Sequence, residues 1–315
     1  MLPDRVVRAL RGVAPPVCAY VYDRATLRSQ AEAVRAALPA GAWLLYAVKA
    51  NSHPEVVATL AEVCDGLEVA SGGELDLAVS AGAGRIAFGG PAKTDAELAA
   101  AVAAGALVHV ESALELRRLD RAARAAGAVA TAALRVNRQA GTPAAASHRM
   151  TGEPTPFGID EAELGAVVAL ARELQAVRLV GFHLHAVSNH LDAAAHGRFA
   201  VEAVRWSVAA AAAHGLALEY VNLGGGFGVD YTGTRRFELD RLAESLAAAA
   251  ALAPGARLAV EPGRLLAADA GWYAAEVLDL KQVHGRWFAV LRGGTHHFRL
   301  PAAWGYSHPF TVLPV

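Results

Sequence analysis

Short apolar runs alternate with longer amphipathic segments along most of this chain of 315 residues. Runs of this kind are typical of buried β-strands, and the segments between them carry apolar residues at helical spacing. The eight strand candidates cover residues 43–49, 66–70, 85–89, 106–111, 131–137, 179–185, 220–224 and 257–261. The helical candidates include Leu27–Leu38, Asp95–Ala104, Glu161–Leu174, Ala200–His214 and Phe237–Leu252. Eight alternating units predict an α/β fold, a (β/α)8 barrel of the TIM type.

Two capping-box patterns indicate where strands give way to helices. Ser71 stands three residues before Glu74, and Thr94 stands three residues before Glu97. A hydroxyl and a carboxylate at this spacing satisfy free backbone N–H groups in the first turn of a helix. Both patterns follow strand candidates, so they support the same register of the repeat.

Polar residues gather where the predicted strands end. The active site of such a barrel is built from the carboxyl ends of its strands, so these residues are expected to meet at one rim. Taken singly, several have a structural explanation: Glu111 could cap the next helix, and His183 could be a hydrogen-bonded core histidine. Together they indicate a site for a cofactor with a phosphate and a ring. The set comprises Lys49, Glu68, Ser71, Gly89, Gly90, Glu111, Arg135, Asn137, His183, His185, Gly224, Gly225, Gly226, Glu261 and Arg264.

Lys49 is the first candidate for a catalytic residue. It follows Trp43–Tyr46, which is expected to be buried on both faces, and a lysine is rarely placed there without a chemical reason. Desolvation would lower the pKa of the amine and free its neutral form, which a Schiff base with an aldehyde requires. The alternative is a lysine whose ammonium reaches solvent at a strand end.

The glycine triplet Gly224-Gly225-Gly226 follows the seventh strand candidate. Without side chains, its backbone N–H groups can approach an anion, and the last two strand-to-helix loops are the usual phosphate site of this barrel. Ser188 could add a hydroxyl donor. A flexible turn would have the same sequence, so the triplet alone does not decide the matter.

Glu261 ends the eighth strand candidate. A carboxylate there can keep the ring nitrogen of pyridoxal phosphate protonated, and the ring accepts the electrons of a departing carboxylate only in that form. An arginine at the ring nitrogen would favour racemisation instead. Glu261 therefore favours decarboxylation, the alternative being a structural salt bridge with Arg264.

Charge and cysteine content exclude other classes of function. The chain has 29 basic and 30 acidic residues and a net charge of −1, so no global field would gather nucleic acid or anionic lipid. Cys18 and Cys64 form no CxxC pair or ligand cluster, and we expect no metal. A chain with so few cysteines suits a reducing cytosol. No apolar signal segment follows the N-terminal arginines, and Ser207–Ala213 is too short to span a bilayer. We expect a cytoplasmic protein.

Seven motifs in order resemble the fold type III pyridoxal-phosphate decarboxylases, the ornithine and diaminopimelate decarboxylase superfamily. They are Tyr46–Asn51, Glu68–Leu75, Leu134–Asn137, Phe157–Asp160, His183–Ser188, Gly224–Gly226 and Glu261–Arg264. The resemblance implies that Lys49 carries the internal aldimine, that His185 stacks on the cofactor ring, and that Glu261 pairs with the pyridine nitrogen. It also implies that Glu68 is an acidic residue near the lysine. The implied phosphate ligands are Ser188, Gly224, Gly225, Gly226 and Arg264.

The resemblance further implies two domains and a homodimer of the full-length protein. The barrel domain would cover residues 26–265, and a mainly β domain would combine residues 1–25 with 266–315. Trp272–Leu280 and Trp287–Leu291 are its expected strands. Relatives supply a proton-donating cysteine and a phosphate-contacting tyrosine from the C-terminal part of that domain, whereas this chain ends at Val315. We therefore expect a truncated β domain and uncertain activity.

Three stretches resemble a narrower branch of siderophore and natural-product enzymes, which decarboxylate an amino-acid unit already attached to citrate or to a carrier. They are Thr155–Asp160, His183–Asp192 and Gly293–Pro301. Val187 and Pro156 replace a glycine and a lysine that are usual in the ornithine and diaminopimelate enzymes, which argues against those simple substrates. The substrate candidates are Arg135, His296 and His297, although the two histidines could equally lie on the β-domain surface. An ornithine- or diaminopimelate-type decarboxylase, a racemase and a non-catalytic cofactor-binding relative remain as alternatives.

Overall fold

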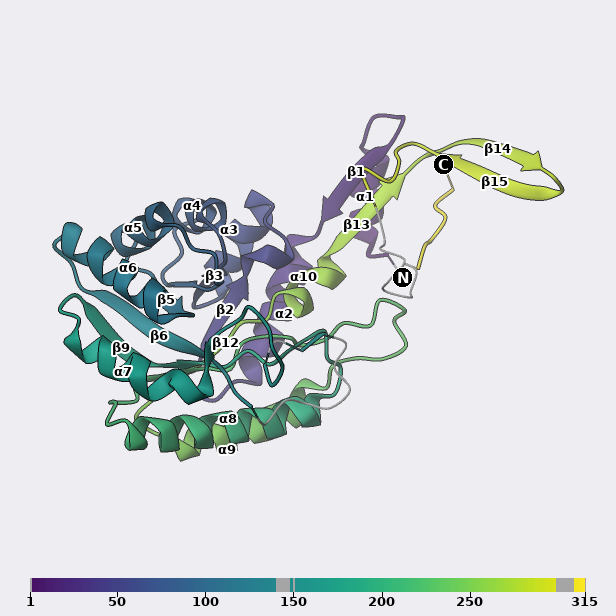
Figure 1. Cartoon of the computed structure of the whole chain (residues 1–315). Coiled ribbons are helices and arrows are strands. Elements are labelled where there is room, and N and C mark those ends of the chain that lie inside the picture. Colours follow the sequence, from purple (N-terminus) through teal and green to yellow (C-terminus); the bar gives the residue numbers. More distant parts are fainter. Residues whose placement is uncertain (1, 140–147, 150, 299–308, 315) are drawn as a thin grey trace.

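A closed barrel of eight parallel strands forms the body of the molecule (Figure 1). The computed structural model describes residues 2–139, 148–149, 151–298 and 309–314. Neighbouring strands pair in chain order, and the ring closes because β12 pairs with β2 and β5 with β6. The strands are β2 (Trp43–Ala47), β3 (Gly66–Val69), β4 (Ile86–Phe88), β5 (Leu107–Val110), β6 (Ala130–Asn137), β9 (Val177–His183), β11 (Tyr220–Asn222) and β12 (Arg257–Val260). The predicted (β/α)8 barrel is confirmed, with ends that differ by a few residues.

Helices follow the strands and cover the outside of the barrel (Figure 1). Thr94 and Glu97 form the complete capping box at α5, as predicted. At α4 the box is only half formed, because Ser71 accepts from the Glu74 N–H while the Glu74 carboxylate accepts from Ala70. The helices are α2 (Arg24–Ala36), α3 (Pro54–Val63), α4 (Gly72–Ser80), α5 (Asp95–Ala103), α6 (Ala113–Ala125), α7 (Leu164–Glu173), α8 (Ala193–Ala213) and α9 (Leu239–Leu252).

The α8 helix starts at Ala193, earlier than the predicted Ala200, because Asp192 caps it by accepting from the Ala195 N–H. A glycine inside its first turns would ordinarily weaken a helix. Here Gly197 lets α8 approach α9, since a Cβ at that position would lie 2.3 Å from the Ser245 hydroxyl. Close packing therefore extends a helix that local propensity alone would shorten.

Alternation of side chains along the strands divides the core into two parts. An inner cluster fills the lower barrel and consists of Leu45, Ala87, Ala133, Val180, Tyr220 and Ala259. Their outward neighbours, such as Leu44, Leu67 and Leu134, belong to a second cluster between strands and helices. Counting from the inner cluster toward the carboxyl end of each strand, every second side chain therefore points into the barrel, and the last of them line its mouth.

Strand β9 keeps this pattern only because of a bulge. Ala132 pairs with Leu179 and Ala133 with Gly181, which leaves Val180 as an extra residue. Val180 belongs to the inner cluster and Phe182 to the outer one, so the bulge exchanges the two faces of the strand. Gly181 has a φ of 153°, and a Cβ there would lie 1.8 Å from the Tyr220 carbonyl oxygen. His183 consequently faces inward.

A smaller β part extends away from the barrel (Figure 1). Strand β1 (Cys18–Tyr22) pairs antiparallel with β13 (Gly271–Ala275), and β14 (Val277–Val283) forms a hairpin with β15 (Arg286–Leu291). The strand expected over Trp272–Leu280 is split at Glu276, whose carboxylate accepts from the Val17 N–H. The division into residues 26–265 and the two flanking pieces stays a prediction.

The remaining elements are short. They are α1 (Asp4–Arg11), the short turn η1 (Val48–Ala50), β7 (His148–Arg149), β8 (Ile159–Asp160), η2 (Glu161–Glu163), β10 (Val187–Ser188), α10 (Arg264–Ala267) and η3 (Ala268–Ala270). Among the described helices, not one combines the length and the apolar character that crossing a bilayer requires.

Candidate active site

One alternation rule brings the predicted residues to the barrel mouth. In β2, Leu45 faces inward, so Ala47 and then Lys49, on η1, lie on the same side. The same counting turns inward a set of polar residues from seven strands. They are Lys49, Glu68, His109, Glu111, Arg135, His183, His185, Asn222 and Glu261. Lys49 is exposed and His185 is half-buried, whereas the other side chains of the set are buried.

Lys49 and Glu68 form an ion pair at this mouth. The lysine side chain is 55% exposed, whereas that of Glu68 is 5% exposed. Partial removal of water acts to lower the pKa of Lys49, but the negative charges of Glu68 and Glu261 outweigh it and leave this pKa raised. The expected lowering of the lysine pKa is therefore wrong for the protein alone. Burial raises the pKa of Glu68, against the charge of Lys49.

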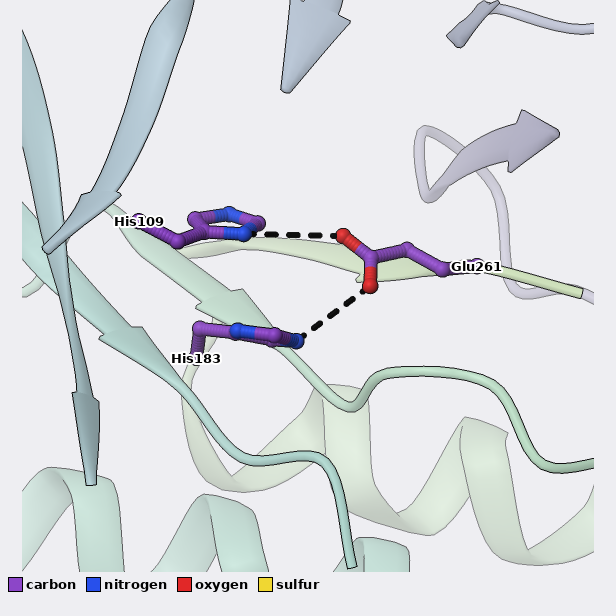
Figure 2. Close-up of side chains that lie close together, drawn as sticks. All are labelled: His109, His183 and Glu261. Carbon is purple, nitrogen blue, oxygen red and sulfur yellow. Dashed lines mark ion pairs between the residues drawn. The ribbon is translucent and has the colours of Figure 1, made fainter. Parts of the chain in front are cut away.

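Glu261 lies beside two stacked histidines (Figure 2). His183 Nε2 is 3.2 Å from Glu261 Oε2, and His109 Nδ1 is 3.7 Å from Glu261 Oε1. The imidazole rings are 4.1 Å apart and inclined by 23°. Burial holds the pKa of both histidines well below its usual value, so both rings are neutral beside the carboxylate.

These three residues also have the donor types of a metal site, with ligand atoms within 4.8 Å of one another. A metal ion requires the nitrogen lone pairs to converge on one point. The two stacked rings instead direct their nitrogens side by side toward Glu261 (Figure 2). We therefore interpret the cluster as a support for the carboxylate.

His185 stands next in the same row of rings, with its centroid 6.4 Å from that of His183. Its Nδ1 accepts a hydrogen bond of 3.1 Å from the Gly225 N–H. Burial lowers the pKa of His185 well below its usual value, so the ring is neutral and carries its proton on Nε2. The orientation of the ring is thus fixed by the glycine turn.

The glycine turn is tightly packed. A Cβ on Gly225 would lie 2.1 Å from the Glu261 carbonyl oxygen, and one on Gly226 would lie 2.1 Å from that of Val187. Gly224 and Gly226 have φ values of 67° and 87°, which favour glycine. The turn therefore lies against both the Glu261 loop and the strand that holds Ser188.

Only part of this turn is free to bind an anion. The Gly224 N–H donates to Asn222 and the Gly225 N–H donates to His185, so two of the expected phosphate donors are already engaged. The Gly226 N–H makes no backbone hydrogen bond to another described residue. Arg264 lies at the start of α10, with its guanidinium 6.0 Å from the Tyr231 ring centre. Gly226, Ser188 and Arg264 are the remaining candidates.

Arg135 is held by protein groups at the mouth. Its Nη1 donates 2.9 Å to Glu111, and its guanidinium lies 4.6 Å from the ring centre of Phe157. Glu111 also accepts 2.9 Å from the Gly158 N–H. The Phe157–Asp160 motif is thereby tied to the barrel rim, and the expected substrate role of Arg135 stays a prediction.

His296 and His297 lie outside the mouth, on the small β part. Both are exposed, and their rings are 4.0 Å apart. The His297 carbonyl accepts from the Tyr20 hydroxyl of β1. Among the contacts described for them, none involves the residues of the barrel mouth. The choice between substrate contact and surface histidine stays open.

Sequence reasoning missed His109, Tyr220 and the role of Asn222. Each has an inward position in a strand that was correctly located. A histidine within the apolar run Leu107–Val110 is unusual and could have identified the first of them. Asn222 ends the seventh strand, and nothing in the spacing reveals its partners.

Comparisons with known proteins agree with this geometry. Residues 24–268 match the family model described as pyridoxal-dependent decarboxylase, pyridoxal binding domain. A 2-[(L-alanin-3-ylcarbamoyl)methyl]-2-hydroxybutanedioate decarboxylase of Staphylococcus aureus is 39% identical over 98% of this chain and 78% of its own length. An L-glutamyl-(BtrI acyl-carrier protein) decarboxylase of Niallia circulans is 30% identical over 94% and 72%. The fold resembles diaminopimelate decarboxylase of Helicobacter pylori complexed with L-lysine, with a TM-score of 0.86, 24% identity, and coverage of 96% and 77%.

Proposed function

This chain belongs to the pyridoxal-dependent decarboxylases, and we propose that it decarboxylates an amino-acid unit attached to citrate or to a carrier. The observation that carries the proposal is the placement of one amine and one acid, Lys49 and Glu261, on the inward side of the same barrel mouth. The negative charge of Glu261 acts on the pKa of Lys49, so the two groups share one environment.

The described residues fit pyridoxal 5'-phosphate. Lys49 would bind the aldehyde, Glu261 would face the ring nitrogen, and His185 would lie against the ring. Gly226, Ser188 and Arg264 would hold the phosphate, with Gly224 and Gly225 shaping the turn. The bound cofactor supplies an electron sink for the bond that breaks.

Proton control at Lys49 falls to Glu68. The amine must lose its proton before it reacts, and the carboxylate that receives its hydrogen bond is the nearest acceptor. Burial raises the pKa of Glu68, which favours uptake of a proton by this carboxylate. We infer that Glu68 exchanges a proton with Lys49 at the Nζ atom.

The names of two relatives support the substrate class. The S. aureus enzyme acts on a hydroxybutanedioate that carries alanine through a carbamoylmethyl arm, which is an amide of citrate. The N. circulans enzyme acts on a glutamyl unit on a carrier protein. In both names, the amino acid is attached to a second chemical group, as the siderophore-type motifs of this chain suggest.

Reduction with borohydride tests the cofactor site. The purified full chain is incubated with pyridoxal 5'-phosphate, reduced, digested and mapped by mass spectrometry. We expect the pyridoxyl group on Lys49 and its loss in Lys49→Ala, with Lys281, an exposed hairpin lysine, as the matched control position. A label found mainly on another lysine would contradict the proposal.

Release of carbon dioxide tests the substrate. The panel contains the citrate amide of diaminopropionate, a glutamyl carrier protein, and free lysine, ornithine and diaminopimelate. We expect release from an attached amino acid and little from the free ones. Release from a free amino acid alone would favour the simpler decarboxylases, and exchange of enantiomers without gas would favour a racemase. A labelled Lys49 with no turnover of any compound would favour a non-catalytic relative.

We also propose that the chain forms a homodimer and works in the cytoplasm. The β14–β15 hairpin extends from the barrel and exposes Leu280 and Trp287 on one of its faces, with Trp287 72% exposed (Figure 1). Apolar groups gathered in this way mark contact surfaces. Sedimentation velocity should show a dimer that Trp287→Glu weakens, and an unchanged dimer would place the interface elsewhere. The free cysteines are consistent with a reducing compartment.

A further inference from the structure

Asn222 connects the two ends of the proposed cofactor site. It ends strand β11, and its side chain is completely buried between the glycine turn and Glu261. Its Oδ1 accepts a hydrogen bond of 2.8 Å from the Gly224 N–H. Its Nδ2 donates 2.6 Å to Glu261 Oε1. One side chain therefore contacts the turn at one end and the carboxylate at the other.

The orientation of this amide is fixed by its partners. Nδ2 donates a second hydrogen bond of 2.7 Å to the Tyr220 hydroxyl oxygen. Rotating the amide by half a turn would place its NH2 group against the Gly224 N–H, where two donors would meet. Asn222 thus uses its acceptor and both donors in one arrangement.

The same arrangement orients His109. Because the Tyr220 oxygen accepts from Asn222, its own proton is available for His109 Nε2, which lies 3.4 Å away. His109 is neutral, so its proton then sits on Nδ1, the atom that faces Glu261 Oε1 at 3.7 Å. The chain of contacts from Asn222 through Tyr220 returns to the carboxylate that Asn222 already holds.

We propose that Asn222 is a positioning residue that fixes the glycine turn and the Glu261 carboxylate relative to each other, so that both ends of the cofactor are bound by one rigid unit. The inference rests on the proposed roles of Glu261 and of the glycine turn. Both donors of Asn222 and one lone pair of its Oδ1 are engaged with protein groups, so it acts through Gly224 and Glu261.

Two substitutions separate the two contacts. Asn222→Leu removes both of them at similar volume. Asn222→Asp keeps an acceptor for the Gly224 N–H but replaces the donor that faces Glu261 with a carboxyl oxygen. Ser207→Ala is the matched control, because Ser207 is also fully buried and its hydroxyl donates within α8, to the Ala203 carbonyl.

Binding of cofactor fragments to the full apo chain provides the readout. Pyridoxal, which lacks the phosphate, probes the ring end, and inorganic phosphate in competition with pyridoxal 5'-phosphate probes the turn. We expect Asn222→Leu to weaken the binding of pyridoxal and of phosphate by about tenfold each, because the ring end and the turn each lose a buried hydrogen bond. Asn222→Asp should weaken pyridoxal by about tenfold and change phosphate by less than about twofold. Ser207→Ala should change neither.

A purely structural role would lower thermal stability in both Asn222 variants without separating the two affinities, and that result would overturn the inference. If Asn222→Leu does not fold, the contrast in Asn222→Asp carries the test alone. Glu261→Gln distinguishes the two levels of proposal. If it leaves pyridoxal binding unchanged, the proposed site is wrong. If Glu261→Gln weakens the binding of pyridoxal while Asn222→Asp does not, only the role of Asn222 is refuted.

Discussion

The ammonium of Lys49 is paired with the carboxylate of Glu68 in the open mouth of the barrel. The lysine thus stands ready for chemistry but protonated, because the carboxylates around it raise its pKa. Its reactivity depends on a neighbour that can take the proton, and this dependence can be measured.

Glu68→Gln should lower the pKa of Lys49, because an opposite charge in contact is removed while the partial burial that lowers the pKa remains. The neutral amine would then be present at lower pH. We expect the pH profile for the rate of attachment of pyridoxal 5'-phosphate, followed by absorbance, to move toward acid. Glu74→Gln is the control, since Glu74 acts on Lys49 more weakly, and a profile that moves toward alkali would contradict the assignment.

Lys93→Met should destabilise the protein by about 3–5 kcal/mol, because it leaves Glu115 buried without its ionic partner. The two side chains are only 1% and 4% exposed, and Lys93 also donates 2.9 Å to the His109 carbonyl. Arg178→Ala, which breaks the exposed pair with Glu219, should cost less than about 1 kcal/mol. Urea unfolding of both variants decides the matter, and equal losses would refute the prediction.

Asp23→Ala should cost roughly 1–2 kcal/mol at neutral pH, because Asp23 caps α2 and pairs with Arg5. The Arg5 guanidinium lowers the pKa of Asp23 to about 2, below its value of about 3.9 in the unfolded chain. The charge-dependent part of this stability is therefore complete above about pH 4 and is lost as the pH falls toward 2.

Unfolding of Asp23→Ala and Asp23→Asn between pH 7 and pH 3 tests this order. Asparagine keeps a capping oxygen, so Asp23→Asn should lose mainly the charged contact and show the smaller deficit. Deficits that grow toward acid in either variant would have the wrong sign.

Gly181→Ala should destabilise the protein by roughly 2–4 kcal/mol, because the added methyl would overlap the Tyr220 carbonyl oxygen. Gly82→Ala is the control, since Gly82 has a φ of 67° but open space around it, and should cost about 1 kcal/mol. If the two variants unfold at the same denaturant concentration, overlap at the bulge is not the cause.

The barrel could be predicted because its signals are local. Apolar runs locate the strands, and Lys49, His185 and Glu261 follow directly from their ends. The charge state of Lys49 could not be predicted, because it depends on carboxylates that come from other strands. The same holds for Asn222. Tyr220 and Gly224 lie within two residues of it, but Glu261 directly follows β12, which is distant in the sequence.

The glycine donors show the same limit. The triplet was predicted to bind a phosphate, which stays a prediction, and its sequence does not tell which N–H groups already donate to Asn222 and His185. Residue type and spacing predict where a backbone can approach a ligand. Only the folded arrangement shows which of its hydrogen bonds are already made.

The irregular step at Gly181 has a bearing on how this barrel can change over time. The extra residue Val180 determines which face of β9 points into the barrel. The side chain that packs in the inner cluster and the side chain that faces the mouth can therefore change independently. Losing that residue would turn the His183 imidazole outward and displace His185, which follows the strand, while leaving every amino acid of the mouth in the sequence. A homologue could thus keep all the residues of the site and still be inactive. A shorter segment between the positions of Leu179 and His183 would identify such a homologue.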